Sequence, residues 1–305
     1  MNSIFVEVDL VQAEWVVTAY ASRDARMLDV VKNKRDPHLR TGSLISNAPE
    51  GFVRHEAKLV GHLSDPDEIR TLRKELPGVW EEDGQEWVLS DFFLPRSMSI
   101  RQAGKKSNHG LNYDMKYKRF ALENEMDESD AKRIEHLYKN VAYKGLLEYY
   151  KDIERELKEN GRRLTNCFGQ TRRFDDRWGP ELLNAAYSFK PQSTVGNVTN
   201  FGLRRIYKDS SIARKVEPCA QVHDSILNNH FYRTPEELCN QLLVVDRHMT
   251  TTCSYHYEDF ELRREYKIGK AWGEGMQDIK WEAPDGPEAL HKALQEWEAT
   301  VEQAA

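Results

Sequence analysis

Two aspartates interrupt apolar runs of the sequence. Asp9 ends the run SIFVEVDL, and Asp224 stands in the segment QVHDSI. A carboxylate in such a place is costly to bury unless it is paired, hydrogen-bonded or bound to a metal ion. If the two segments are neighbouring strands of one sheet, the acids could hold two hard cations, an arrangement that serves phosphoryl displacement. The alternative is a helix cap at Asp9 and a turn-forming His-Asp pair at Asp224.

A second group of candidate residues follows a spacing of four. If residues 98–120 form a helix, one of its faces carries two cations followed by two rings: Arg101, Lys105, His109 and Tyr113. The cations would bind a triphosphate, and the rings would support the sugar and base attached to it. The spacing therefore predicts a nucleotide-binding face.

Two stretches are basic, although the chain has a net charge of −6 that argues against indiscriminate binding to nucleic acid. Residues 101–120 hold six Lys or Arg against one Asp, and residues 161–173 hold four Arg and no acid. A single stretch of this kind is usually a solvated face. The two together, with Tyr113, Tyr117 and Phe120 interleaved, favour a site for a polyanion.

The elements that position these residues follow from periodicity and from turn residues. Alternating apolar residues predict a strand over 3–10, and helical spacing follows over 11–31. Four prolines interrupt residues 42–96, which we expect to be an irregular excursion from the core with a hairpin at Asp83-Gly84. The predicted basic helix follows this excursion.

The second half of the chain reads mainly as helices and hairpins. We expect one long helix over 127–161, capped by Asp127 or Ser129 and ended by Asn160-Gly161. The further predictions are a hairpin in LTNCFGQTRRF, a helical region through LRRIY, and an acid-bearing strand or hairpin in VEPCAQVHDSIL. A final helix is expected to dock through Leu290, Leu294, Trp297 and Val301.

Length and composition indicate a soluble globular protein. The 305 residues allow one large domain or two interleaved ones, and 39% hydrophobic with 31% charged residues supplies both a core and a solvated surface. No window is apolar enough to cross a membrane, and acids follow the amino terminus too closely for a signal peptide, so we expect a cytoplasmic protein without a membrane partner. The four cysteines have no CxxC spacing and suit reduced thiols.

Six motifs, in the correct order and spread over nearly all of the chain, resemble those of the family A DNA polymerases. DLVQAEW resembles the family's D-x-S-Q-x-E-L-R, RQAGKKSNHGLNY its R-x3-K-x3-F-x3-Y-G, and QVHDS its V-H-D-E. DPHLRT resembles D-x-H-x2-T, FKPQST resembles I-Q-G-T, and YKIGKAWGE resembles K-x-G-x-N-W-G-E. Chance agreement over six ordered motifs is improbable.

The resemblance implies an α+β fold, a polymerase palm with an antiparallel sheet and inserted helical fingers. Residues 1–35 would form the palm's first catalytic strand and helix, and residues 166–305 the rest of the palm with the second catalytic acid. Residues 36–165 would form the fingers, with an insertion at about 43–96 that makes the interval from His38 to Arg101 longer than usual.

The resemblance also implies template-directed DNA synthesis, in which a deoxynucleotidyl group passes from a dNTP to a primer 3′-OH. Asp9, Asp224 and the Leu10 carbonyl would bind two Mg²⁺ ions, for which Mn²⁺ can substitute. The residues implied to bind the nucleotide are Glu14 as the steric gate, His38, Arg101 and Lys105 on the triphosphate, His109, and Tyr113 under the nascent base pair. The residues implied to contact primer-template DNA are Gln192, His223 and, in the second basic stretch, Arg172 and Arg173.

The sequence departs from the family pattern at several positions. Val11 and Val16 replace Ser and Arg, Ser225 replaces the usual Glu after the second acid, and Asp114 stands where the family has Gly. His109 replaces Phe or Tyr. Both metal-binding acids are present, so catalysis is expected, and the departures bear on fingers movement after Tyr113, on the electrostatics beside Asp224 and on sugar selectivity at the 3′ position.

The family places its thumb, and any exonuclease domain, ahead of the first motif, which here is preceded by eight residues. We therefore expect both domains to be absent from this chain. Either a second polypeptide supplies the thumb and, in some arrangements, the exonuclease, as in a split polymerase of phage type, or the chain is a fragment; the strand predicted at the amino terminus favours the first. Two alternatives are an accessory DNA-binding subunit with a decayed active site and, less favoured, a two-metal phosphohydrolase or nuclease that uses Asp9, His223 and Asp224.

Overall fold

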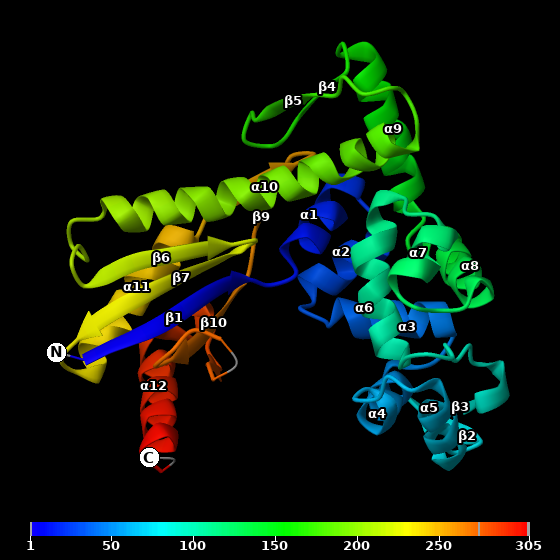
Figure 1. Ribbon diagram of the computed structural model, residues 1–305, viewed down its shortest axis with the longest axis horizontal. Coiled ribbons are helices and arrows are strands. Elements are labelled where there is room, and N and C mark those ends of the chain that lie inside the picture. The colour runs from blue at the N-terminus through cyan, green and yellow to red at the C-terminus, as the bar shows by residue number, and fades with distance from the viewer. Residues whose placement is uncertain (1, 274, 304–305) are drawn as a thin grey trace. The chain divides into compact units, whose positions relative to one another are not determined.

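The computed structural model describes residues 2–273 and 275–303, and the chain divides into two compact units (Figure 1). Unit 1 takes its described residues from 1–17, 166–170 and 191–305, and unit 2 comprises 18–165 and 171–190. The helices α1 (Ala13–Ser22) and α10 (Pro180–Lys208) each contribute residues to both units. Glu274, the last residue of the YKIGKAWGE motif, lies outside the described residues.

A five-stranded antiparallel sheet forms the centre of unit 1. Its order is β11-β10-β1-β7-β6, so the first strand of the chain lies in the middle. The strands are β1 (Asn2–Leu10), β6 (Val216–Val222), β7 (Ser225–Tyr232), β10 (Arg264–Gly269) and β11 (Gln277–Ile279). The predicted strand over 3–10 and the acid-bearing hairpin are confirmed, as is a mixed fold of helices with an antiparallel sheet.

One face of this sheet is core and the other is polar. Val6, Val8 and Leu10 of β1 are buried and alternate with the half-buried Glu7 and Asp9, as a strand with one covered face requires. The alternation fixes the register of β1, because a slip by one residue would bury both acids.

Two helices and a small hairpin complete unit 1. The helix α11 (Pro235–Met249) packs on β7, and α12 (Gly286–Gln303) packs on β11 and on α11. Leu290, Leu294 and Trp297 of α12 are buried, which confirms the predicted docking face at these positions, and the side chain of Val301 lies outside the described part of the structure. The strands β8 (Thr252–Tyr255) and β9 (Glu258–Glu261) form a separate hairpin. No helix in the described part of the chain is both long and apolar enough to cross a bilayer.

Unit 2 is largely helical. Besides its part of α1 and α10, its helices are α2 (Ala25–Lys32), α3 (Pro37–Ser46), α4 (Glu50–Val60), α5 (Pro66–Leu72), α6 (Ile100–Gly110), α7 (Tyr117–Glu123), α8 (Glu128–Leu137) and α9 (Gly145–Glu159). Two short hairpins accompany them, β2 (Val79–Glu82) with β3 (Gln85–Val88) and β4 (Arg163–Thr165) with β5 (Thr171–Arg173). Both hairpins were predicted from the sequence.

The helices α3 and α6 approach each other unusually closely. A Cβ atom added at Gly104 of α6 would lie 2.2 Å from the carbonyl oxygen of His38 and 2.7 Å from the amide nitrogen of Gly42. Only glycine fits there, because real Cβ atoms do not approach backbone atoms so closely. This contact places the start of α3 against the middle of α6.

The expectation of an irregular excursion over residues 42–96 is wrong. This segment contains α4, α5 and the β2–β3 hairpin, and its side chains pack into a core with α3 and α6. That core includes Phe52, Phe92 and Ile100, with Trp80 and Trp87 packed against it. The prolines misled the sequence reading because Pro66 starts a helix and Pro49 immediately precedes one, positions where proline is tolerated.

Two predicted helices are shorter than expected. The basic helix ends at Gly110, and a 3₁₀ turn over Leu111–Tyr113 leads to Asp114 in the left-handed region at a φ of 62°. The helix over 127–161 is broken: a π turn over Tyr138–Ala142 separates α8 from α9. The break is stabilised by burial of Tyr138 and Tyr143, whose rings meet edge to face at 5.0 Å.

Replacing Gly104 by Ala is expected to destabilise unit 2, because the new methyl group would force α3 and α6 apart. Overpacking of this kind costs about 1–3 kcal/mol, which thermal unfolding followed by circular dichroism can measure.

Gly196→Ala is the matched control, since Gly196 lies inside α10 and an added Cβ there meets nothing within 4 Å. This alanine should stabilise the chain by about 0.5–1 kcal/mol. Equal stability of the two variants would contradict the close packing of α3 on α6.

Candidate functional site

Asp9 and Asp224 lie side by side at one end of the sheet of unit 1. Asp9 is the penultimate residue of β1 and pairs in register with Ser225, the residue that follows Asp224. The backbone amide of Leu10 donates to the carbonyl oxygen of Asp224 at 3.3 Å, which fixes the turn against the end of β1. Both aspartates are half-buried. The structure thus brings together the two acids that the sequence singled out.

Further polar residues surround this pair. Ser225 and Glu265 stand opposite Asp9 on the neighbouring strands, and Glu7 lies two residues earlier on the same face of β1. The hydroxyl of Ser225 donates to Glu7 Oε1 at 2.9 Å. Burial, and then the negative charges of Asp224, Glu265 and Glu7, raise the pKa of Asp9 to about 7, although Lys267 opposes the shift.

His223 and Asp224 form the two-residue turn between β6 and β7. His223 has a φ of 53°, in the left-handed region that non-glycine residues seldom adopt, and its side chain is exposed. Turns with this conformation match the twist of the strands that they join. The His-Asp turn proposed as the alternative at Asp224 is therefore present, and it places the carboxylate beside Asp9.

The donor set at this end of the sheet suits a hard cation. Mg²⁺ prefers oxygen ligands, and proteins usually hold it by one or two carboxylates while water and substrate phosphate complete its coordination. Two adjacent carboxylates that repel each other match that pattern, since a cation would remove the repulsion. No group of three or more His, Cys, Asp or Glu side chains placed to hold a metal ion occurs among the described residues.

The second predicted group lies in unit 2, where α3 meets α6. The guanidinium of Arg101 contacts Asp36 Oδ2 through Nε at 2.9 Å and through Nη2 at 2.8 Å. Asp36 also caps α3, because its Oδ1 accepts from the backbone amides of His38 and Leu39. One carboxylate thus anchors the start of α3 and the first cation of α6.

His38 lies against this cation cluster. The centre of its ring is 5.9 Å from that of His109, and its Nδ1 is 3.2 Å from the side-chain nitrogen Nδ2 of Asn108. Burial is the main cause that lowers the pKa of His38 to about 4, with His109, Arg101 and Lys105 adding to it and Asp36 opposing it. The ring is therefore uncharged at neutral pH, whereas Lys105 is exposed and makes no ion pair with any residue in the described ranges.

Tyr113 belongs to the 3₁₀ turn after α6 and not to the helix. The predicted face of four residues therefore holds for Arg101, Lys105 and His109 only. Asp114, next to Tyr113, binds Lys139 at 2.7 Å and Lys116 at 2.7 Å, and Lys139 also binds Glu135. This network fixes the backbone after Tyr113, so the aspartate at this position has a structural partner that the sequence did not reveal.

Glu14 and Gln192 both belong to unit 1. Glu14 lies in the first turn of α1, half-buried, shortly after β1 ends. Gln192 is exposed on α10, next to Pro191 within the helix.

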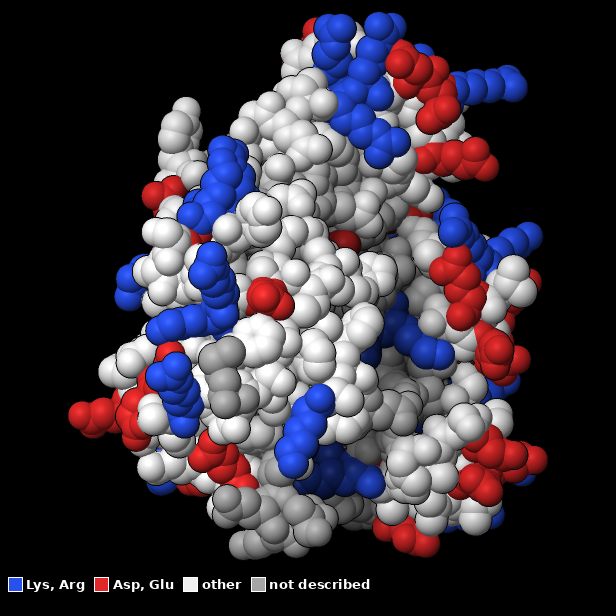
Figure 2. Space-filling view, turned by 60° about the vertical axis from the view of Figure 1, so that its left-hand side comes forward, with Lys and Arg blue, Asp and Glu red and all other residues white. Residues whose placement is uncertain are grey.

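The arginines of the second basic stretch lie on the β4–β5 hairpin. Arg172 is exposed with its guanidinium 4.8 Å from the ring of Phe174, and Arg173 contacts Asp175 at 2.7 Å. Figure 2 shows Lys and Arg side chains gathered at the top of the view, at the level of this hairpin and α9 in Figure 1. One of the two predicted DNA-contacting arginines is thus already paired with an acid.

Three acidic residues of these clusters received no role from the sequence, although Asp36 stands first in the DPHLRT motif. Glu7 could have been found, because a strand places residues two apart on one face. Asp36 could have been found from Asp-Pro at a helix start. Glu265 had no signal, since only the pairing of β1 with β10 brings it to Asp9.

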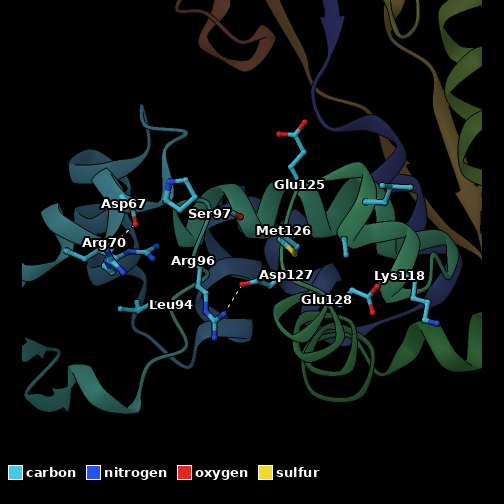
Figure 3. Close-up of a pocket in the computed structure, with 14 residues that line it drawn as sticks. Asp67, Arg70, Leu94, Arg96, Ser97, Lys118, Glu125, Met126, Asp127 and Glu128 are labelled. Atoms are coloured by element: carbon cyan, nitrogen blue, oxygen red, sulfur yellow. Dashed lines mark hydrogen bonds and ion pairs between the residues drawn. The ribbon is translucent and has the colours of Figure 1, made fainter.

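A cavity of about 1000 Å³ lies elsewhere in unit 2, between the segment around α5 and the loop before α8 (Figure 3). Leu94 and Met126 contribute apolar surface. Its charged groups largely satisfy each other, since Arg96 pairs with Asp127 at 2.8 Å and Arg70 with Asp67 at 3.0 Å. None of the predicted site residues lines it.

No protein-family model matches the chain, and no curated protein is similar to it in sequence. The structure is similar to the POL domain of Pol1 from M. smegmatis, solved in complex with DNA primer-template and dNTP. The TM-score is 0.60 at 16% sequence identity, and the match covers 88% of this chain and 40% of that chain. At this identity the similarity shows the fold alone: the chain has a polymerase-like fold and spans about two fifths of its structural neighbour.

The raised pKa of Asp9 predicts how stability depends on pH. Between the ordinary value of 3.8 and about 7, the folded chain keeps a proton that the unfolded chain releases, so this group lowers stability as pH rises through that range. With a chelator present, the melting temperature of the unmodified chain should fall more between pH of about 5 and 8 than that of Asp9→Asn.

The control is Glu217→Gln, at the start of β6 and exposed, which should keep the pH dependence of the unmodified chain. Identical pH profiles for the unmodified chain and Asp9→Asn would show that Asp9 has an ordinary pKa.

Proposed function

We propose that the chain catalyses template-directed DNA synthesis, the transfer of a deoxynucleotidyl group from a dNTP to a primer 3′-OH. The observation that carries the proposal is the juxtaposition of Asp9 and Asp224 on adjacent antiparallel strands. The polymerase-like fold supports it, because the structural neighbour was solved with primer-template and dNTP. Fold alone does not carry an activity, so the proposal depends on the residues at this site.

The proposal assigns parts of the chain to the parts of a polymerase. Residues 1–35 and 166–305 would form the palm, and residues 36–165 the fingers. The five-stranded sheet of unit 1 and the helical character of unit 2 support this assignment. The insertion at about 43–96 would stiffen the fingers, because its core is shared with α3 and α6.

Asp9, Asp224 and the Leu10 carbonyl would hold Mg²⁺, for which Mn²⁺ can substitute. Bound there, the ions would lower the barrier by neutralising charge on the attacking and leaving oxygens. The residues around them tune the site: Glu7 accepts a hydrogen bond from Ser225, which keeps that hydroxyl beside the second acid where the family has a glutamate. Lys267 offsets part of the surrounding negative charge.

Arg101, Lys105 and His38 would bind the triphosphate of the incoming nucleotide. Asp36 contacts Nε and Nη2 of Arg101, which leaves Nη1 for a phosphate oxygen and holds the guanidinium in one orientation. Lys105 is exposed and makes no ion pair within the described part of the chain, so its charge is available to the leaving pyrophosphate. The neutral His38 would act as a hydrogen-bond donor.

The sugar and base of the nucleotide would meet three further residues. Glu14 would fill the space of a 2′-hydroxyl and so favour deoxynucleotides, His109 would lie near the sugar, and Tyr113 would lie under the nascent base pair. The network from Asp114 to Lys139 supports this role, because it holds the turn that carries Tyr113.

Four further residues would contact primer-template DNA. Gln192 would read the minor groove near the primer end, and His223 would steady the primer terminus from the turn beside Asp224. Arg172 and Arg173 would contact the phosphate backbone, with Arg172 the stronger candidate because Arg173 already pairs with Asp175. A second polypeptide that completes the grip on DNA stays a prediction.

Primer extension with purified chain, Mg²⁺ and dNTPs tests the proposal. Asp9→Asn and Asp224→Asn keep the shape of the side chain but remove its charge, so extension should fall by several powers of ten while DNA affinity changes little. Glu217→Gln, at the other end of β6, removes a charge from the same sheet and should leave extension unchanged.

Near-normal extension by Asp9→Asn would remove the basis of the proposal. If the unmodified chain degrades the primer, a nuclease is shown instead, and binding without turnover indicates an accessory subunit.

A further inference from the structure

The last turns of α10 carry cations that the proposed active site does not use. Arg204 and Lys208 are exposed, and neither makes an ion pair or a side-chain hydrogen bond with another residue in the described ranges. With Phe201 they follow a helical spacing of three and four, which places all three on one face of α10.

This face forms one wall of a cavity of about 530 Å³ within unit 1. Six residues line it: Phe201, Arg204, Arg205, Lys208, Asp209 and His248. Three contacts hold its walls in place. His248 Nε2 lies 2.6 Å from Asp209 Oδ2, and Arg205 donates to the backbone carbonyls of His248 and Thr250 at 3.1 and 2.9 Å.

The cavity is positively charged. Three cationic side chains face one carboxylate, and hydrogen bonds from Ser211 and His248 lower the pKa of Asp209 to about 2, so this carboxylate is ionised and already engaged. Arg205 is occupied by carbonyl oxygens. The charges left for a ligand are therefore those of Arg204 and Lys208, which select an anion.

An aromatic surface adjoins these cations. The ring of Phe201 lines the cavity and meets the ring of Phe168, from the loop 166–170, edge to face at 5.2 Å. Both rings are only half-buried. The loop is fixed on α10, because the amide of Asn166 donates to Ser193 and Asn197 at 3.0 and 2.7 Å. A ring held beside two free cations offers a base a stacking surface next to sites for its phosphates.

The cavity lies at the end of the sheet opposite Asp9. Residues 209–215 connect α10 to Val216, the first residue of β6, which pairs with His230, and His230 pairs with Ile4 near the start of β1. Asp9 is at the other end of β1. Figure 1 shows the end of α10 on the left of the view, the side on which β1 begins.

We propose that this cavity is a second nucleic-acid site, which binds single-stranded DNA through its phosphates on Arg204 and Lys208 and through a base on Phe201. The inference deepens the proposed function, since a polymerase substrate has a single strand beyond the duplex at its active site. A single strand fits better than a duplex because only unpaired bases expose their faces for stacking.

The test is fluorescence anisotropy of a labelled oligothymidylate in the presence of a chelator and without dNTPs, over a range of salt concentrations. Arg204→Ala with Lys208→Ala should weaken binding about tenfold and reduce the slope of log affinity against log salt by about 1.4, since each contact to a single-strand phosphate contributes about 0.7. Phe201→Leu should weaken binding roughly fivefold without changing the slope.

Lys280→Ala with Lys292→Ala is the matched control. It removes the same charge from two exposed positions, Lys280 directly after β11 at the sheet edge opposite β6 and Lys292 on α12, and should leave binding unchanged. Equal affinity and slope for the two double variants would overturn the inference.

Competition separates the possible sources of phosphate. Unlabelled single strand should displace the probe, whereas blunt duplex and free dNTP at equal phosphate concentration should not. Displacement by free dNTP would make this a nucleotide site, and displacement by duplex would make it a duplex contact; either result overturns the assignment. This assay measures binding and not turnover. A chain without polymerase activity can still bind single-stranded DNA at this cavity, and an active polymerase can lack the cavity site. Failure of this inference is therefore distinguishable from failure of the proposed function.

Discussion

The antiparallel pairing of β1 with β7 is the constraint on which the rest of the candidate site depends. It sets Asp9 opposite Ser225. Asp224 immediately precedes Ser225 in the two-residue turn, so it lies beside Asp9. The apolar residues of β1 lock this register, because a slip by one residue would bury Glu7 and Asp9 and expose Val6 and Val8. Hydrophobic burial on one face therefore stabilises an unfavourable concentration of negative charge on the other.

In unit 2, as in unit 1, packing of the backbone determines where the charged side chains lie. Close packing of α3 on α6 at Gly104 brings the start of one helix against the cations of the other, and Asp36 then links the two through the cap of α3 and the guanidinium of Arg101. The pairing of β1 with β7 in unit 1 and the packing at Gly104 in unit 2 involve no charged groups themselves, but they fix the positions of the charged groups nearby. Negative charge gathers at the end of the sheet that carries Asp9, and positive charge gathers where α3 meets α6, the two kinds of surface that cations and triphosphates require.

Local signals predicted much of this arrangement. Alternating apolar residues predicted β1, Asp83-Gly84 predicted the turn of the β2–β3 hairpin, and helical spacing predicted the buried face of α12. The errors came from long-range packing. The break between α8 and α9 depends on the burial of Tyr138 and Tyr143. The regular structure of residues 42–96 depends on a core shared with α3 and α6. A local sequence pattern reveals neither contact. Glu265 illustrates the same limit, since pairing of distant strands brings it to Asp9.

The central claim is that Asp9 and Asp224 together form a cation site, and direct measurement of Mn²⁺ binding by electron paramagnetic resonance tests it without any need for turnover. Free Mn²⁺ gives the signal, so its loss on addition of protein reports binding. The unmodified chain and Glu217→Gln should take up Mn²⁺ alike, while Asp9→Asn and Asp224→Asn should each weaken binding by at least roughly tenfold. Mn²⁺ uptake by Asp9→Asn equal to that of the unmodified chain would contradict the account.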